Sequence, residues 1–207
     1  MSGSNVPKVL TAAYALQAVE GYVKQLGVEQ LDLVVIHYPS EKSSNNQAVW
    51  RGLEQAVAKN LTRAIGLSNF GQTQIEPILK IATIRPAVNQ CPMRVGYLGS
   101  FCGPRDASIA YNQAQNITFS AWSPVKMCPV TNAGLVAIAT AHSKTPVQVC
   151  LRWLLDRGLA FAVGTGSDSV KADEYSKEDL DIYDFRLTSE ELKTLNALSG
   201  DSLKGNV

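Results

Sequence analysis

The stretch Leu31 to Ser40, LDLVVIHYPS, decides the fold class because a run of apolar, strand-forming residues ends abruptly in polar and aromatic ones. Only Asp32 interrupts the apolar residues up to Ile36, which is typical of a strand buried on both faces, as in a parallel sheet. His37 then stands at the carboxyl end of such a strand, where α/β proteins place ligands and chemistry. The competing interpretation is a core histidine satisfied by a backbone group.

Length and composition are those of an ordinary globular domain. The 207 residues are 45% apolar and 18% charged, and 19 Lys and Arg against 18 Asp and Glu give a formal charge of +1. With so small a net charge, the protein has no strong positive electrostatic potential that would attract nucleic acid or anionic membranes. No apolar stretch approaches the length of a membrane span, and the amino terminus, MSGSNVPK, lacks the blocks of a signal peptide. We expect one cytoplasmic domain over residues 1–207, with no nucleic-acid or membrane partner.

The four cysteines show no pattern that predicts a metal site. They are Cys91, Cys102, Cys128 and Cys150, with no CxxC and no Cys/His pair at metal-ligand spacing. Since reduced thiols are the default in a cytosolic chain, we expect free cysteines and no metal.

The rest of the chain alternates helices and strands. Apolar spacing predicts helices at 7–26, around 49–57, and at 72–82, 104–115, 132–142, 145–157 and 188–198, and strands at 31–36, 63–67, 86–88, 117–122 and 159–163. Such alternation is the signature of parallel βαβ units. A closed eight-stranded barrel typically needs about 250 residues, so five units form an open sheet or a barrel that lacks three units. Because the alternation has no gap, any missing part would precede residue 1.

Polar and aromatic residues gather where these strands end. They are His37, Ser68, Asn69, Asn89, Gln90, Trp122, Ser123 and the loop Gly164-Thr165-Gly166-Ser167. Amides and hydroxyls at one rim suit a ligand with a carboxamide and phosphates, and an aromatic face suits stacking on a flat ring. Glycines in the last loop would let backbone N–H groups approach phosphate oxygens.

Six stretches resemble the aldo-keto reductase family, whose fold is an eight-stranded (β/α) barrel. They are LDLVVIHYP (31–39), RAIGLSNF (63–70), RPAVNQ (85–90), FSAWSPV (119–125), TPVQVCLRWLLDRG (145–158) and LDIYDFRLTSEEL (180–192), in the family's order. The resemblance implies an α/β fold of the (β/α)8 TIM-barrel type, incomplete, with about five of eight βα units, so that residues 1–207 are the C-terminal part of the barrel. It also implies an NAD(P)-dependent oxidoreductase that reduces an aldehyde or ketone to an alcohol.

The resemblance assigns roles to the matching positions. His37 matches the active-site histidine, which orients the substrate carbonyl and can donate a hydrogen bond to its oxygen. Ser68, Asn69 and Gln90 match residues that hold the nicotinamide carboxamide, which fixes the face of the ring that delivers hydride. Trp122 stands where an aromatic residue, usually tyrosine, stacks on that ring.

The other end of the cofactor is assigned to later loops. Ser123 and Val125 begin the loop along the pyrophosphate, and the adenosine-ribose end falls at Gly164, Thr165, Gly166 and Ser167. In relatives that prefer NADP, a Lys and an Arg reach the 2′-phosphate. Here Tyr175 aligns with that Arg, and Lys171 would offer a point charge without the bidentate fork of a guanidinium. The family favours NADPH as the cofactor, with NADH possible.

The family's catalytic Asp, Tyr and Lys lie on strands that precede this chain's first helix, and no residue from Met1 to Val28 matches them. Losing the positioned Tyr acid typically costs about 10² to 10⁴ in rate. Tyr38 is not expected to replace it, because it follows His37 on the same strand and should point away.

Two functional interpretations stay open. The first is an aldo-keto reductase recorded without its first three βα units. The second is a non-catalytic paralogue that starts at Met1 and serves as a nucleotide-binding or assembly subunit, with self-association or a partner covering the open edge of strand 31–36. A Rossmann-type dinucleotide binder is disfavoured, since HYPS stands where GxGxxG would follow the first strand.

Overall fold

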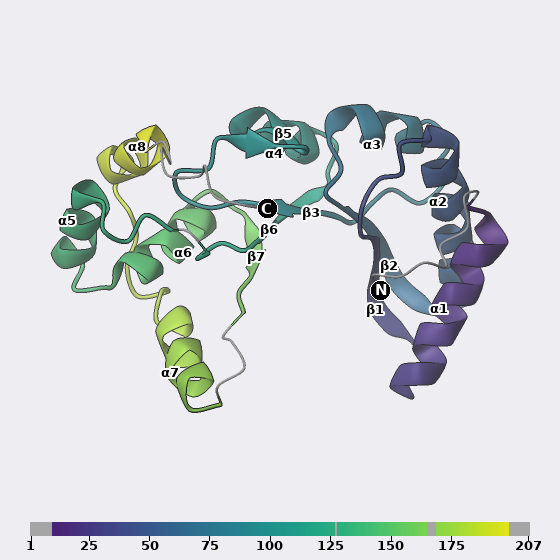
Figure 1. Ribbon diagram of the computed structural model, residues 1–207, viewed down its shortest axis with the longest axis horizontal. Helices are drawn as coiled ribbons and strands as arrows, with labels where there is room; N and C mark the ends of the chain where they lie inside the picture. Colours follow the sequence, from purple (N-terminus) through teal and green to yellow (C-terminus); the bar gives the residue numbers. More distant parts are fainter. Residues whose placement is uncertain (1–9, 127, 165–168, 199–207) are drawn as a thin grey trace. The chain divides into compact units, whose positions relative to one another are not determined.

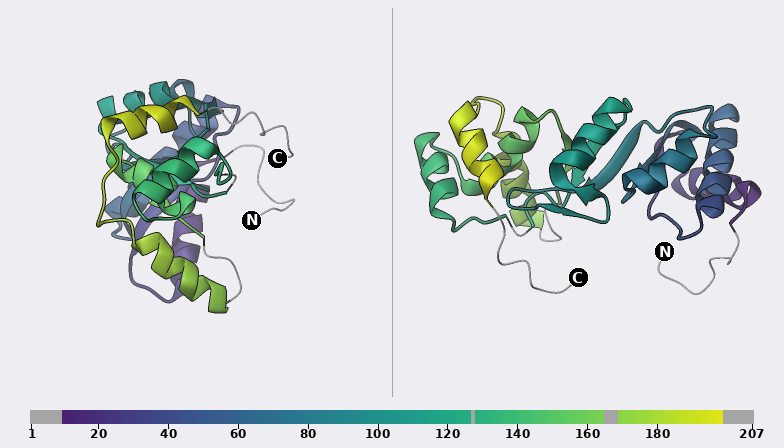
Figure 2. Two further views of the ribbon diagram at one scale, coloured as in Figure 1. Left: turned by 90° about the vertical axis from the view of Figure 1, so that its left-hand side faces the viewer. Right: turned by 90° about the horizontal axis from the view of Figure 1, so that it is seen from above.

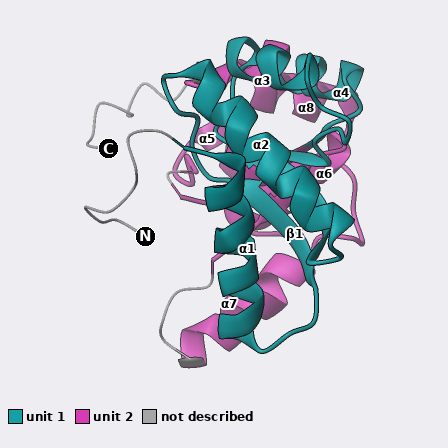
Figure 3. Ribbon diagram, turned by 90° about the vertical axis from the view of Figure 1, so that its right-hand side faces the viewer, with its two compact units in different colours: residues 1–90, 108–118 teal, residues 91–107, 119–207 magenta. Residues whose placement is uncertain are grey.

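The structure, a computed structural model, describes residues 10–126, 128–164 and 169–198 (Figure 1). The chain divides into two compact units, residues 1–90 with 108–118 (unit 1) and residues 91–107 with 119–207 (unit 2), shown in teal and magenta in Figure 3. Each unit carries parallel strands covered by helices, and the larger sheet has five strands. The single domain expected over residues 1–207 stays a prediction.

Unit 1 is a run of strand and helix pairs. Its elements are α1 (Ala12–Leu26), β1 (Leu31–Ile36), α2 (Ser43–Ala58), β2 (Thr62–Ser68), α3 (Gln72–Leu79), the start of β3 (Val88–Pro92) and most of α4 (Arg105–Ala114). β1 pairs in parallel with β2, and β2 pairs in parallel with β3 through Leu67 opposite Asn89 and Ser68 opposite Gln90. The carboxyl ends of the three strands therefore lie at one edge of the sheet.

The core of unit 1 forms where α2 and α3 pack on the strands. Trp50 of α2 is fully buried and donates its indole N–H to the Ile84 carbonyl at 3.2 Å. Helix α1 packs on α2, and it begins at the Thr11 cap and ends at Gly27, whose φ of 66° is the left-handed C-cap that glycine adopts at little cost. These contacts fix the strands that carry the predicted site.

No residue of strand β1 is fully buried, so the expectation of burial on both faces is wrong. Leu31, Val34 and Ile36 pack against the core, whereas Asp32 is exposed and Leu33 keeps 47% of its surface. The reason is position: among the described residues β1 pairs only with β2 and is an edge strand.

Unit 2 contains the later strands and helices of the chain. Its elements are β4 (Gly99–Ser100), β5 (Gly103–Pro104), β6 (Thr118–Trp122), α5 (Ala133–Ala141), α6 (Pro146–Asp156), β7 (Ala160–Ala162), α7 (Ser169–Leu180) and α8 (Ser189–Ala197). β6 pairs in parallel with β7. Helices α5, α6 and α8 pack together, and Figure 2 shows them from two further directions. Capping boxes open α6 at Thr145 and α8 at Thr188.

Three elements differ from the sequence expectation. The strand expected at 86–88 runs from Val88 to Pro92, so Asn89 and Gln90 lie within it. A hairpin of β4 and β5 was not predicted, and neither was α7. Helix α7 lacks an apolar stripe and is supported instead by charges, for example the i,i+4 pair of Asp173 and Lys177 at 2.7 Å.

The cysteines of unit 2 form two disulfides, which overturns the expectation of free thiols. Cys91 at the end of β3 is joined to Cys102 in the β4–β5 hairpin, and Cys128 is joined to Cys150 of α6. Spacing along the chain carried no hint of these pairs, because the cysteines of each pair are brought together only by the tertiary fold.

Thiol labelling tests the disulfides directly. If both are present, unfolding the chain without a reductant and adding iodoacetamide should leave all four cysteines unmodified, and prior reduction should give four modified residues by mass spectrometry. Labelling of all four without reduction would show that the pairs are neighbouring thiols.

A matched pair of glycine substitutions tests the packing of unit 1. A Cβ at Gly66 would lie 2.6 Å from Val88 Cγ1 and 2.8 Å from the Val88 carbonyl oxygen, whereas a Cβ at Gly21 meets nothing within 4 Å. Gly66→Ala should destabilise the fold by about 1–3 kcal/mol through overpacking. Gly21→Ala should stabilise helix α1 by roughly 0.5–1 kcal/mol. Urea unfolding of both variants measures the difference, and equal midpoints would contradict the β2–β3 contact.

Candidate functional site

Asn69 ties together the ends of the strands of unit 1. It directly follows β2 with φ of 67°, a left-handed conformation that Asn tolerates better than most residues. Its side-chain N–H groups donate to the His37 carbonyl oxygen at 2.9 Å and to Ser68 Oγ at 3.1 Å. The side chain thus links the end of β1 to the end of β2.

Gln90 of β3 completes this link through its main chain. Its carbonyl oxygen accepts the Ser68 hydroxyl at 3.0 Å and the Asn69 backbone N–H at 2.8 Å. The structure therefore brings together His37, Ser68, Asn69 and Gln90, the four unit 1 residues that the sequence predicts for the site. We call these four residues the strand-end cluster.

The hydrogen bonds decide what the strand-end cluster can still offer to a ligand. Both N–H groups of the Asn69 amide and the hydroxyl hydrogen of Ser68 are used within the protein, so these two residues, each 2% exposed, can contribute only acceptor oxygens. The Gln90 side chain is half-buried and, among the described residues, its amide makes no hydrogen bond. Acceptors beside an uncommitted amide match the N–H and C=O groups of a ligand carboxamide.

Asn89 has a structural role, although it stands among the polar residues that the sequence places at the strand ends. It is fully buried, donates to the Phe70 carbonyl oxygen at 2.8 Å and accepts the Phe70 N–H at 3.4 Å. This pair of bonds holds the turn after β2 in the shape that Asn69 requires.

His37 is exposed just beyond the end of β1. Its ring centroid lies 4.4 Å from that of Tyr38, with the planes tilted by 47°. The expectation that Tyr38 points away from His37 is therefore wrong. The alternation of side chains applies within a strand, and β1 ends at Ile36, so the two rings lie on a bend where both can face the same side.

The residues predicted in unit 2 are partly described. Trp122 ends β6 half-buried and accepts the Met93 N–H on its carbonyl oxygen at 3.3 Å, and Ser123 follows it with φ of 52°. Val125 and Gly164 are described. Thr165, Gly166 and Ser167 lie outside the described residues.

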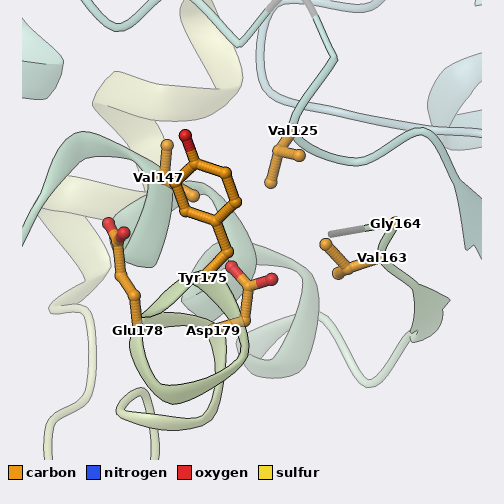
Figure 4. A pocket seen from close by; sticks show the side chains of 7 residues that line it. All are labelled: Val125, Val147, Val163, Gly164, Tyr175, Glu178 and Asp179. Atoms are coloured by element: carbon orange, nitrogen blue, oxygen red, sulfur yellow. The ribbon is translucent and has the colours of Figure 1, made fainter. Parts of the chain in front are cut away.

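Val125 and Gly164 line the same cavity, within unit 2. Its volume is about 440 Å³, and its described lining is Val125, Val147, Val163, Gly164, Tyr175, Glu178 and Asp179 (Figure 4). Trp122 and Ser123 are not among these lining residues. Five of the seven, Val147, Val163, Tyr175, Glu178 and Asp179, are missing from the predicted site residues.

Helix α7 supplies the polar wall of the cavity. Tyr175, Glu178 and Asp179 stand at i, i+3 and i+4 and share one face of the helix. Thr145 donates its hydroxyl to the Glu178 carboxylate, and Gln148 donates to the Glu178 carbonyl oxygen at 3.1 Å, which fixes α7 against the start of α6. Burial and the neighbouring Glu178 raise the pKa of Asp179 above its ordinary value. The helical spacing was the signal that could have found these residues in the sequence.

The sequence of the chain is similar to those of known proteins. The family model described as "Aldo/keto reductase family" matches residues 4–135. This chain belongs to that family. Glyoxal reductase of Bacillus subtilis (strain 168) is 35% identical over 191 residues, which are 92% of this chain and 64% of that protein. The chain thus spans about 64% of the length of the curated relatives it matches.

Solved structures agree with the family assignment. The aldose reductase from Schistosoma japonicum superposes with a TM-score of 0.76 at 30% identity, over 91% of this chain and 64% of that one. An aldo-keto reductase of Bombyx mori in complex with NADP gives a TM-score of 0.77 at 26% identity, again over 91% and 64%. The fold is therefore the TIM-barrel type of this family, with five parallel strands as an incomplete barrel.

Two further properties concern the described residues only. No group of three or more His, Cys, Asp and Glu side chains is placed to hold a metal ion within them. In the same ranges, every helix is too short or too polar to cross a membrane.

Substitutions at Asn69 test the link between the strand ends. Asn69→Gly keeps the left-handed backbone but loses the side-chain bonds, and should destabilise the fold by about 1–3 kcal/mol. Asn69→Ala also forces a Cβ into that conformation, and should be worse by roughly 1 kcal/mol or more. The control is exposed Asn116, with φ of 55° and no side-chain bond among the described residues, where Gly should be nearly neutral. Urea unfolding measures all three, and an Asn69→Gly variant as stable as Asn116→Gly would contradict the link.

Proposed function

We propose that the chain carries part of an aldo-keto reductase that reduces an aldehyde or ketone to an alcohol with a nicotinamide dinucleotide. The observation that supports this proposal is the strand-end cluster, in which buried acceptor oxygens and an uncommitted amide lie beside an exposed histidine. A ligand carboxamide, which has N–H donors and a C=O acceptor, can use both kinds of group at once. The relatives named reductase, and the NADP in the Bombyx mori structure, agree with this chemistry.

The residues of the strand-end cluster fit the nicotinamide end of the cofactor. The oxygens of Ser68 and Asn69 would accept the carboxamide N–H groups, and the Gln90 amide would donate to its carbonyl oxygen. When bound, the cofactor supplies the hydride. The protein groups fix the ring in one orientation, and holding reactants in this way contributes a large part of catalysis.

His37 is proposed to act on the substrate. A ring nitrogen of its exposed imidazole would donate a hydrogen bond to the substrate carbonyl oxygen, which orients the carbonyl and stabilises the negative charge that develops there. The Asn69 bond to the His37 carbonyl holds the backbone of this residue and so sets where the ring can reach.

The remaining predicted residues are proposed for the rest of the cofactor. Trp122 would stack on the nicotinamide ring, Ser123 and Val125 would lie along the pyrophosphate, and the adenosine end would use Gly164, Thr165, Gly166 and Ser167. The cavity beside Val125 and Gly164 supports the last two of these assignments.

A titration followed by a turnover assay tests the proposal. Adding NADPH or NADH should quench tryptophan fluorescence, and glyoxal or an aromatic aldehyde should then oxidise the reduced cofactor. Absence of binding by either cofactor would overturn the proposed function for this chain.

Binding without turnover would favour the second candidate, a non-catalytic nucleotide-binding or assembly subunit. The observation that favours this alternative is the edge strand β1, where Leu33 is 47% exposed and a partner or second copy could add a strand.

A histidine pair provides the sharpest variant test. His37→Ala should lower kcat/KM for the carbonyl by about 10²- to 10³-fold, the range for losing one hydrogen-bond donor to a developing oxyanion, and leave cofactor affinity unchanged. The control is His142→Ala, which removes the other histidine and its 2.9 Å contact with Glu191 and should keep kcat/KM. Equal activities of the two variants would remove His37 from the reaction.

A further inference from the structure

A disulfide stands at the end of strand β3, next to the strand-end cluster along the chain. Cys91 is peptide-bonded to Gln90 and is paired with Cys102, at a sequence separation of 11. Two residues beyond Cys91, the Met93 N–H donates to the Trp122 carbonyl oxygen at 3.3 Å. Cys91 therefore lies on a strand whose main chain is held on either side of it, and its bond to Cys102 fixes the intervening segment to that strand.

The hairpin that carries Cys102 is small and buries little apolar surface. Strands β4 and β5 have two residues each and pair in the antiparallel direction. The side chains of Leu98 and Phe101 are 59% and 55% exposed, whereas Cys102 is 5% exposed. Since a two-stranded hairpin on its own is at best marginally stable in water, the disulfide is expected to contribute much of what holds this hairpin in place.

The other disulfide joins a segment that has stronger support of its own. Cys150, the partner of Cys128, lies in helix α6, whose residues 148–154 are all buried. Helical hydrogen bonds and this packing are expected to keep α6 in place without the disulfide. Breaking the two disulfides should therefore have different results, because only the Cys91–Cys102 bond has a marginal element at one end.

We propose that Cys91 and Cys102 form a redox-modification site, at which a dithiol reductant opens the disulfide, releases the β4–β5 hairpin and weakens binding of the carbonyl substrate. The inference rests on the proposed function for the carbonyl, and it adds a control of the same site. Loops at the carboxyl ends of parallel strands carry binding groups in α/β proteins, and this hairpin directly follows such an end. A segment that must be ordered on binding lowers affinity, so the oxidised chain should have the lower KM.

The reaction is a thiol–disulfide exchange. A thiolate of the reductant attacks Sγ of Cys102, the less buried partner, and the S–S bond breaks so that Cys91 leaves as a thiolate and takes up a proton. The second thiol of the reductant then displaces the Cys102 thiolate, which is protonated in turn. Two electrons and two protons thus pass from the dithiol to the pair. The attack requires local opening, which a hairpin with exposed side chains undergoes more readily than a packed helix.

Hydrogen exchange of the full chain, oxidised and then reduced with dithiothreitol, tests the release of the hairpin. Peptides that cover residues 98–105 should exchange faster after reduction by on the order of tenfold or more, because the loop is no longer closed by a covalent bond. Iodoacetamide labelling of the same samples reports which cysteines are reduced. Replacing dithiothreitol with oxidised glutathione, which takes the two electrons back, should restore slow exchange.

Variants assign the effect to one disulfide. Cys102→Ser should give fast exchange at the hairpin with or without reductant, and should raise KM for the carbonyl by about two- to tenfold. The matched control is the double variant Cys128→Ser and Cys150→Ser, in which the hairpin should exchange slowly until dithiothreitol is added. Circular dichroism melting confirms that each variant is folded, and the comparison of the oxidised and reduced natural chain needs no variant.

The outcomes separate this inference from the proposed function. If no dinucleotide binds, or if binding occurs without turnover, the proposed reductase function fails and the effect on the carbonyl fails with it, whereas hydrogen exchange still decides the release of the hairpin. If turnover occurs with equal KM in both redox states, the proposed function stands and the inference is overturned. Equal exchange of residues 98–105 in both states, or labelling of Cys91 and Cys102 without reduction, would also overturn it.

Discussion

The hydrogen bonds of Asn69 are the constraint on which the candidate site depends. Parallel strands are held along their length by backbone bonds, but their ends fray unless something joins them. Asn69 joins the ends of β1 and β2 through its side chain and reaches β3 through its backbone N–H. A left-handed non-glycine residue costs of order 1 kcal/mol or more, so this backbone persists because the surrounding bonds over-determine it.

The same bonds set the chemical character of the site. Because Asn69 and Ser68 use their hydrogens on protein oxygens, they would meet the proposed ligand as acceptors, and the donor would be the side-chain amide of Gln90 on the neighbouring strand. Asn89 stabilises the turn between them from inside the core. The site is therefore specified by buried polar contacts, which hold a geometry better than apolar packing does because an unpaired buried group is costly.

The sequence predicts the strands, most helices and the members of the strand-end cluster, since apolar periodicity and the polar ends of strands are local signals. The sequence does not predict features that depend on tertiary contacts. The apolar run of β1 predicts burial on both faces, yet β1 is the edge strand of the sheet and its residues are partly buried or exposed. Helix α7 is stabilised by charge pairs and by Thr145 and Gln148 of α6, none of which an apolar pattern reveals. Disulfide partners depend on distances that the chain spacing does not contain.

The strand-end cluster and the unit 2 cavity are held by different kinds of contact. The strand-end cluster of unit 1 offers neutral acceptors and a neutral amide, and hydrogen bonds between the strand ends fix its geometry. The cavity of unit 2 is lined on one side by Tyr175, Glu178 and Asp179, which project from one face of helix α7 and are exposed or only partly buried. Substitutions on such a helix face are therefore expected to disturb the fold less than substitutions in the strand-end cluster, where each lost hydrogen bond leaves a buried polar group unpaired.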